Sequence, residues 1–177
     1  MSVFRRRTPI KVLFAGLDAA GKTTILNKLK LGPDNSAVMT TMPTLSFNAA
    51  VLDHKRVQFG MWDVGGQDNL RPFWRHHYTG TQAVVYVVDA NDEDRISQSG
   101  DELHAMLADR ELRFACVLVL ANKADLPYAV SDAMLRRQMR LDQLPPGLDW
   151  RLIRTCARTG AGLSEALDWL HAHSKPL

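Results

Sequence analysis

The stretch that decides the fold is Gly16-Leu17-Asp18-Ala19-Ala20-Gly21-Lys22-Thr23. It matches the phosphate-binding pattern G-x-x-x-x-G-K-[ST] at every position. Apolar residues at 10 and 12–14 precede it and predict a strand, and residues 24–31 follow with apolar side chains at helical spacing. Backbone N–H groups and the positive end of the helix dipole then point at one place, which makes an anion site. The alternative is a glycine-rich turn that matches by chance, and the flanking strand and helix argue against it.

Two side chains at the end of this loop carry chemistry. Lys22 supplies a mobile cation for the outer phosphates of a nucleotide. The hydroxyl of Thr23 is a natural ligand for Mg²⁺. We therefore expect a bound phosphate chain together with magnesium.

Length and composition favour one globular domain. The chain has 177 residues, 46% of them hydrophobic and 23% charged, as in ordinary soluble proteins. The net charge of +3 is too small to argue for nucleic acid as a partner. Cys116 and Cys156 form no disulfide or metal pattern. Because no secretory signal and no apolar run long enough to cross a bilayer are present, we expect a cytoplasmic protein.

Strand and helix patterns alternate along the rest of the chain. Strands are expected at residues 45–52, 57–62, 83–88, 115–121 and 152–155, and helices at 69–78, 93–107, 131–139 and 163–171. Gly100 is a local weakness in the second of these helices. The alternation predicts an α/β fold with a doubly wound, mainly parallel six-stranded sheet, helices on both faces and one antiparallel edge strand. Ligands of such sheets bind beyond the carboxyl ends of the strands.

The segment Asp63-Val64-Gly65-Gly66-Gln67 follows one of these strands. A carboxylate at Asp63 would hold magnesium through a water, and the glycines at 65 and 66 let the backbone approach the terminal phosphate. Gln67 is suited to orient an attacking water. A plain turn at the end of a strand is the alternative.

The segment Asn122-Lys123-Ala124-Asp125 follows another strand and suits guanine. Asp125 would accept hydrogen bonds from the ring N–H and the exocyclic amine of guanine, which adenine does not offer, so the motif selects the base. The stem of Lys123 would lie over the base plane, and Asn122 would hydrogen-bond the loop. The alternative is a surface turn.

Two weaker signals complete the site. The hydroxyl of Thr44 would join the magnesium shell while its amide meets the terminal phosphate, a contact that exists only while that phosphate does. A threonine that merely starts a strand is the alternative. Backbone N–H groups at Cys156 and Ala157 would meet the base oxygen, although Cys156 also suits a small core position.

Taken together, these motifs resemble the ADP-ribosylation-factor (Arf and Arf-like) branch of the Ras-superfamily small GTPases. The resemblance covers nearly the whole chain from about Ile10. The matching stretches are GLDAAGKTTIL (16–26), WDVGGQD (62–68), RPFWRH (71–76), VDAND (88–92), ANKADLP (121–127), TCA (155–157) and LDWL (167–170). It implies a GTPase domain over residues 10–177 behind a short, basic, flexible segment at 1–9.

The resemblance also implies a site and an activity. GTP or GDP with Mg²⁺ would be held by Gly16, Leu17, Asp18, Ala19, Ala20, Gly21, Lys22, Thr23, Thr24, Thr44, Asp63, Gly65, Gly66, Asn122, Lys123, Asp125, Cys156 and Ala157. Thr23 and Thr44 would ligate magnesium directly, with Asp63 acting through water, and Gln67 would be catalytic. The docking surface for effectors would include Phe47, Trp62 and, where the family has a tyrosine, His77 or the adjacent Tyr78.

In cells, the resemblance implies a switch used in vesicle traffic. Its partners would be a guanine-nucleotide exchange factor, a GTPase-activating protein and effectors, and the protein would be a monomer in the cytoplasm, at the cytosolic face of endomembranes such as the Golgi. Besides His77, three features depart from the family. Ser2 replaces the acceptor glycine for myristoylation, the N-terminal segment is short, and the first switch loop is longer around residues 33–37 with Ser46 in place of a glycine. Three arginines at 5–7 support only weak contact with an anionic membrane.

Three functions compete at this stage. The first is a slow GTP hydrolase that a partner accelerates. The second is a scaffold locked on its nucleotide with little or no turnover, which the unusual first switch loop and His77 would suit. The third is a small-metabolite kinase with the same phosphate loop, and the guanine motif argues against it.

Overall fold

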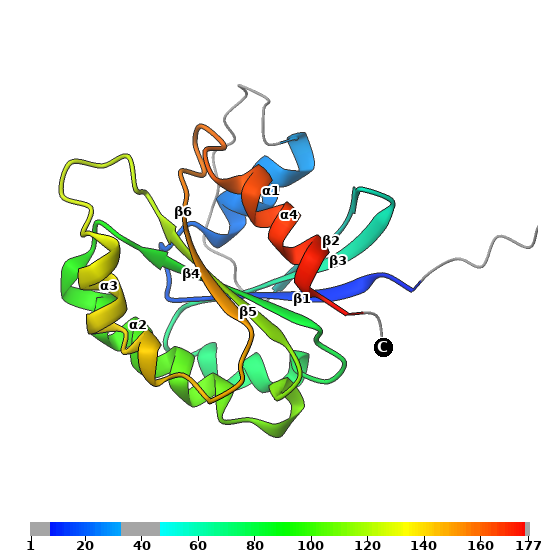
Figure 1. Ribbon diagram of the computed structural model, residues 1–177, viewed down its shortest axis with the longest axis horizontal. Coiled ribbons are helices and arrows are strands. Elements are labelled where there is room, and N and C mark those ends of the chain that lie inside the picture. The colour runs from blue at the N-terminus through cyan, green and yellow to red at the C-terminus, as the bar shows by residue number, and fades with distance from the viewer. Residues whose placement is uncertain (1–7, 33–46, 176–177) are drawn as a thin grey trace, which may run out of the picture.

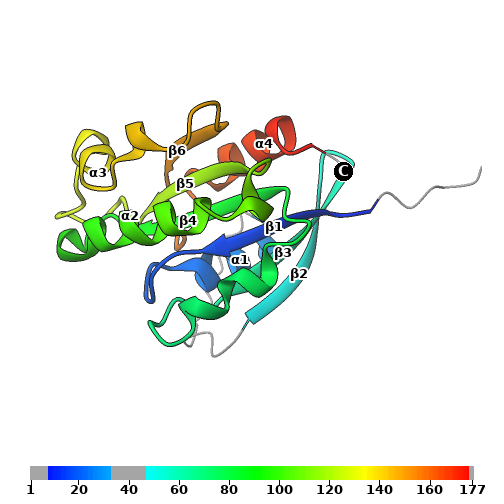
Figure 2. The ribbon, with the colours of Figure 1, turned by 90° about the horizontal axis from the view of Figure 1, so that it is seen from below.

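A computed structural model describes residues 8–32 and 47–175. Its centre is one six-stranded sheet in the order β2-β3-β1-β4-β5-β6, which can be followed in Figure 2. The β2–β3 pair is antiparallel and every other pair is parallel. The strands are β1 (Ile10–Ala15), β2 (Phe47–His54), β3 (Val57–Val64), β4 (Ala83–Asp89), β5 (Cys116–Asn122) and β6 (Trp150–Arg154). The predicted fold class is confirmed.

Helices cover both faces of the sheet, α1 and α4 on one side and α2 and α3 on the other (Figure 1). Their bounds are α1 (Lys22–Leu31), α2 (Glu93–Leu107), α3 (Asp132–Gln138) and α4 (Leu163–His173), and the 3₁₀ turns are η1 (Arg71–His77), η2 (Arg110–Leu112) and η3 (Leu141–Gln143). The hydroxyl of Ser131 caps α3 by accepting from the backbone N–H of Met134 at 3.2 Å.

Two apolar cores hold these layers together, one on each face of the sheet. Strand β5 is buried throughout and β4 is buried except at Asp89. Both strands contribute to both cores, because alternate side chains point to opposite faces. Gly100 of α2, expected as a weak point, has a packing reason. A Cβ on it would lie 2.6 Å from the Cα of Met139, so glycine lets α2 approach the end of α3.

The elements lie close to the expected ones. The segment at 69–78, expected as a short, irregular helix, forms the 3₁₀ helix η1, with Pro72 near its start. The last strand begins at Trp150, two residues earlier than expected, because Trp150 pairs with Val117 of β5. The short turns η2 and η3 were not expected, since three residues show no periodicity.

The parallel arrangement brings the chemical segments to one edge of the sheet. The loops that follow β1, β3, β5 and β6 all leave from carboxyl ends of strands, where α/β sheets bind ligands. Within residues 8–32 and 47–175, no helix has the length and apolar character needed to cross a membrane.

Candidate functional site

Asn122, at the end of β5, joins three loops of the site. Its Nδ2 donates to the carbonyl of Ala20 in the phosphate loop at 2.9 Å. Its Oδ1 accepts from the hydroxyl of Thr155 at 3.2 Å and from the backbone N–H of Ala157 at 3.1 Å. With only 1% of its surface exposed, Asn122 is a structural link between loops, in agreement with the expectation that it hydrogen-bonds the phosphate loop.

Lys123 forms a second link between the same regions. Its ammonium donates to the carbonyl of Ala19 at 2.7 Å and pairs with Asp89 at 2.6 Å. The side chain therefore runs from the loop after β5 back to the phosphate loop. Asp125 is exposed two residues further along.

The end of the phosphate loop carries the cation and oxygen ligands that phosphate and magnesium require. The ammonium of Lys22 donates to the carbonyls of Gly16 at 2.9 Å and Leu17 at 2.8 Å. Burial lowers the pKa of Lys22 to about 8, although Asp63 and Asp18 act in the opposite direction. The hydroxyl of Thr23 donates to Oδ2 of Asp63, a fully buried carboxylate, at 2.5 Å.

The segment after β3 lies directly on the phosphate loop. The backbone N–H of Asp18 donates to the carbonyl of Gly66 at 3.0 Å. A Cβ on Gly66 would lie 2.5 Å from the backbone N of Asp18 and the carbonyl oxygen of Gly16, so only glycine allows this approach. The indole of Trp74 donates to the carbonyl of Gly65 at 2.8 Å and fixes the turn that Gln67 begins.

Arginines and acidic side chains that the sequence analysis did not single out surround this contact. Arg71, whose side chain is 8% exposed, donates to the carbonyl of Gly66 and pairs with Asp68 and Glu102. Arg95 of α2 pairs with Asp18 at 2.9 Å. Arg71 lies in one of the stretches that resemble the family, and Arg95 lies close to another. The spacing of residues in the sequence does not indicate with which carboxylate an arginine will form an ion pair.

The backbone N–H groups of Cys156 and Ala157, predicted to meet the base oxygen, have acceptors within the chain. The backbone N–H of Cys156 donates to the carbonyl of Ala161 at 3.0 Å, and that of Ala157 donates to Asn122. Both donors are therefore engaged within the chain, and both residues are buried. Their contact with the base oxygen stays a prediction. Thr44 and the rest of the first switch loop lie outside the described residues.

Three aromatic rings meet at the edge of the sheet beside β2 and β3. The ring centroids of Phe47 and Trp62 are 5.5 Å apart, and His77 lies 5.2 Å from Phe47 and 5.8 Å from Trp62. Phe47 is 46% exposed. Tyr78, the alternative to His77, is 5% exposed and packs in the core, so it has no surface to present to a partner.

Comparison with known proteins now bears on this geometry. The family model described as "ADP-ribosylation factor family" matches residues 1–174. The chain belongs to the ADP-ribosylation factor family. A solved structure of the Arl6 (BBS3) small GTPase from Trypanosoma brucei, with the bound nucleotide analogue GppNp, is 28% identical to the chain. The alignment covers 93% of this chain and 96% of that one, with a TM-score of 0.83.

As a member of the ADP-ribosylation factor family, the protein is a GTP-binding switch and a GTP hydrolase that uses GTP, GDP and Mg²⁺. The site fits these ligands. Thr23 and Asp63 place a hydroxyl and a buried carboxylate side by side, which are oxygen ligands of the kind Mg²⁺ prefers. A Cβ on Gly21 would lie 2.3 Å from Nδ2 of Asn122, so the glycine keeps the loop close to its support.

Proposed function

We propose that the protein is a slow GTP timer, loaded by an exchange factor, discharged by an activating protein, and read by effectors in membrane traffic. The observation that carries this proposal is the contact between Asp18 and Gly66. This hydrogen bond couples the phosphate loop to the segment after β3. Loss of the terminal phosphate would therefore change the conformation of that segment and of the surface that it forms.

The proposed roles at the site combine the contacts described above with the sequence motifs. The backbone of residues 16–24 lines the phosphates, and Lys22 neutralises the outer ones. Thr23 and Thr44 would ligate magnesium, with Asp63 acting through a water, and the bound magnesium would supply charge neutralisation for phosphoryl transfer. The backbone of Gly65 and Gly66 meets the terminal phosphate, Gln67 orients the attacking water, and Asp125 reads guanine under the stem of Lys123.

The local arginines support slow intrinsic turnover. Arg71 and Arg95 lie near the phosphate loop, but acidic side chains engage both of them. A transition-state arginine therefore has to come from a partner, and intrinsic turnover is expected at about 10⁻³ per second or less.

For recognition, we assign effector docking to Phe47, Trp62 and His77, defined here as the aromatic cluster. Their mutual contacts and the exposure of Phe47 support this role. A monomer in the cytoplasm, acting at the cytosolic face of endomembranes such as the Golgi, completes the proposal. The basic segment at residues 1–7, to which weak membrane contact was assigned, lies outside the described residues.

The test is to measure loading and turnover on one preparation. Protein loaded with fluorescent GDP is mixed with excess GTP, with and without a magnesium chelator, and conversion of bound GTP to GDP is followed by chromatography. The proposal expects release that the chelator accelerates, together with slow hydrolysis. A nucleotide that neither leaves nor hydrolyses, even with a cognate activating protein, would instead establish the locked scaffold.

A further inference from the structure

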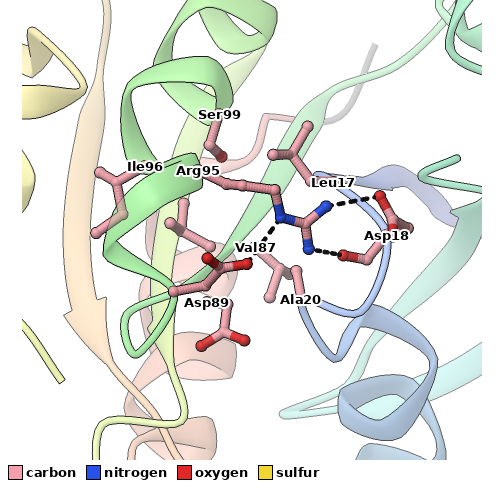
Figure 3. Close-up of a pocket in the computed structure, with 10 residues that line it drawn as sticks. Leu17, Asp18, Ala20, Val87, Asp89, Arg95, Ile96 and Ser99 are labelled. Carbon is pink, nitrogen blue, oxygen red and sulfur yellow. Dashed lines mark hydrogen bonds and ion pairs between the residues drawn. The ribbon is translucent and has the colours of Figure 1, made fainter. Parts of the chain in front are cut away.

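Arg95 of α2 holds the phosphate loop from the side. Its Nη1 donates to Oδ1 of Asp18 at 2.9 Å, and its Nη2 donates to the backbone carbonyl of the same residue at 3.0 Å (Figure 3). Its Nε donates to Oδ2 of Asp92 at 2.7 Å. The planar guanidinium thus binds both the side chain and the backbone of Asp18, and Asp92 fixes the orientation of the guanidinium.

The cavity beside this contact is too small for a second ligand. The cavity lined by Leu17, Val87 and Ile96 beside the guanidinium holds about 10 Å³, room for about one water. The side chains of Arg95 and Asp18 are 33% and 43% exposed, and the cavity beside them has no room for another ligand. We therefore look for the function of Arg95 in its effect on Asp18.

Asp18 places a carboxylate in the loop that lines the phosphates in the proposed function. Its backbone N–H meets Gly66, so it belongs to the end of the loop that faces the terminal phosphate in the proposed function. A free carboxylate there would repel the phosphates. In the structure the carboxylate is drawn toward α2 by Arg95, and Nη2 of Arg71 lies 3.7 Å from the same carboxylate oxygen.

We propose that Arg95 is a positioning residue for the nucleotide. It neutralises the Asp18 carboxylate, holds it away from the phosphates, and fixes the loop through the Asp18 carbonyl. This inference rests on the proposed function, in which residues 16–24 line the phosphates. Because GTP places one more charged group near Asp18 than GDP does, the loss of Arg95 weakens GTP binding more than GDP binding.

A charge-rescue experiment tests the inference. Affinities for fluorescent GTP and GDP analogues are measured for the wild type, Arg95→Ala, Asp18→Asn and the double variant. Arg95→Ala is expected to lose about tenfold in GTP affinity and clearly less for GDP. The double variant recovers most of the loss, because the repelling charge is gone. Arg151→Ala is the matched control, since it removes an exposed pair with Glu165 remote from the loop.

Three outcomes overturn the inference: unchanged affinities in Arg95→Ala, an equal loss for both nucleotides, or a loss that Asp18→Asn does not restore. The last two are the signature of a merely structural role. If Arg95→Ala does not fold, Asp18→Asn alone decides, because it keeps the acceptor oxygen and removes the charge. Asp18→Asn is expected to raise the preference of the protein for GTP over GDP, and a lowered preference refutes the positioning role of Arg95. A wild type that binds neither nucleotide would refute the proposed function itself.

Discussion

Nδ2 of Asn122 donates to the carbonyl of Ala20 at 2.9 Å, across 102 positions of sequence. This hydrogen bond connects the loop after β5, to which we assign base selection, to the phosphate loop. The opposite oxygen of the same amide accepts from Thr155 and Ala157, so one buried side chain fixes the geometry of three loops.

Asn122→Ala is therefore expected to loosen the whole site. It leaves the Ala20 carbonyl and the Ala157 N–H without their partner in a buried environment, at a cost of about 2–4 kcal/mol in the free energy of unfolding. The affinity of Asn122→Ala for guanine nucleotides should fall together with its stability. Chemical denaturation and nucleotide titration measure both effects. Thr155→Val, which removes only the 3.2 Å donation to Asn122, is the control and should cost about 1 kcal/mol or less. Equal losses in the two variants would contradict the linking role.

Lys22 predicts a pH dependence of nucleotide binding. Burial lowers its pKa from 10.5 to about 8 in the nucleotide-free protein, so the unfolded chain holds more protons between these values. The stability of the nucleotide-free protein should therefore rise from pH 8 to about 10.5 through this group. Bound phosphates favour the ammonium form, so binding at about pH 8.5 should take up protons.

Calorimetry of GDP binding at about pH 8.5 in two buffers of different ionisation enthalpy measures this uptake. The apparent binding enthalpy should differ between the buffers for the wild type, and this difference should shrink in Lys22→Met. Identical enthalpies in both buffers for the wild type would show that Lys22 does not titrate on binding.

Sequence reasoning located the strands, the loops and their order because each motif follows an apolar run that ends in a turn. It did not predict which polar groups form hydrogen bonds and ion pairs with one another. No pattern in the sequence indicated that the amides of Cys156 and Ala157 donate to Ala161 and Asn122. Likewise, nothing in the spacing of Arg95 and Asp18, 77 positions apart, indicates that they pair. Such contacts depend on how helices pack on the sheet, which periodicity does not specify.

Gly66 is expected to tolerate no side chain. A Cβ there would meet backbone atoms of Gly16, Leu17 and Asp18 at 2.5 Å, and backbone does not move aside cheaply. Gly66→Ala should push the segment after β3 off the phosphate loop and lower GTP affinity by about tenfold or more. Gly60→Ala is the control, since its Cβ would lie 3.7 Å from its nearest neighbour, an ordinary contact. Fluorescent GTP titration compares them, and full affinity in Gly66→Ala would refute the steric argument.

Gln67→Leu should separate binding from catalysis. The residue begins the turn next to Gly66, where an amide side chain suits a water but has no assigned contact with the nucleotide. Hydrolysis stimulated by an activating protein should fall by about 100-fold or more, while GTP affinity changes by less than about threefold. Asn69→Leu, an exposed amide in the same segment, is the control. Stimulated turnover at the native rate would remove Gln67 from the mechanism.

The aromatic cluster gives a prediction that can be checked before any effector is identified. Proteins captured by GTP-loaded but not GDP-loaded wild type define the effector set. Phe47→Ala should lower their capture by about tenfold, because exposed aromatic anchors dominate the energetics of docking. Phe73→Ala removes a ring of similar exposure, 55% against 46%, that contacts only the imidazole of His76 among the ring pairs of the described residues. If Phe73→Ala loses as much capture as Phe47→Ala while both variants still load GTP, docking does not depend on the cluster and the surface has to be reassigned toward η1.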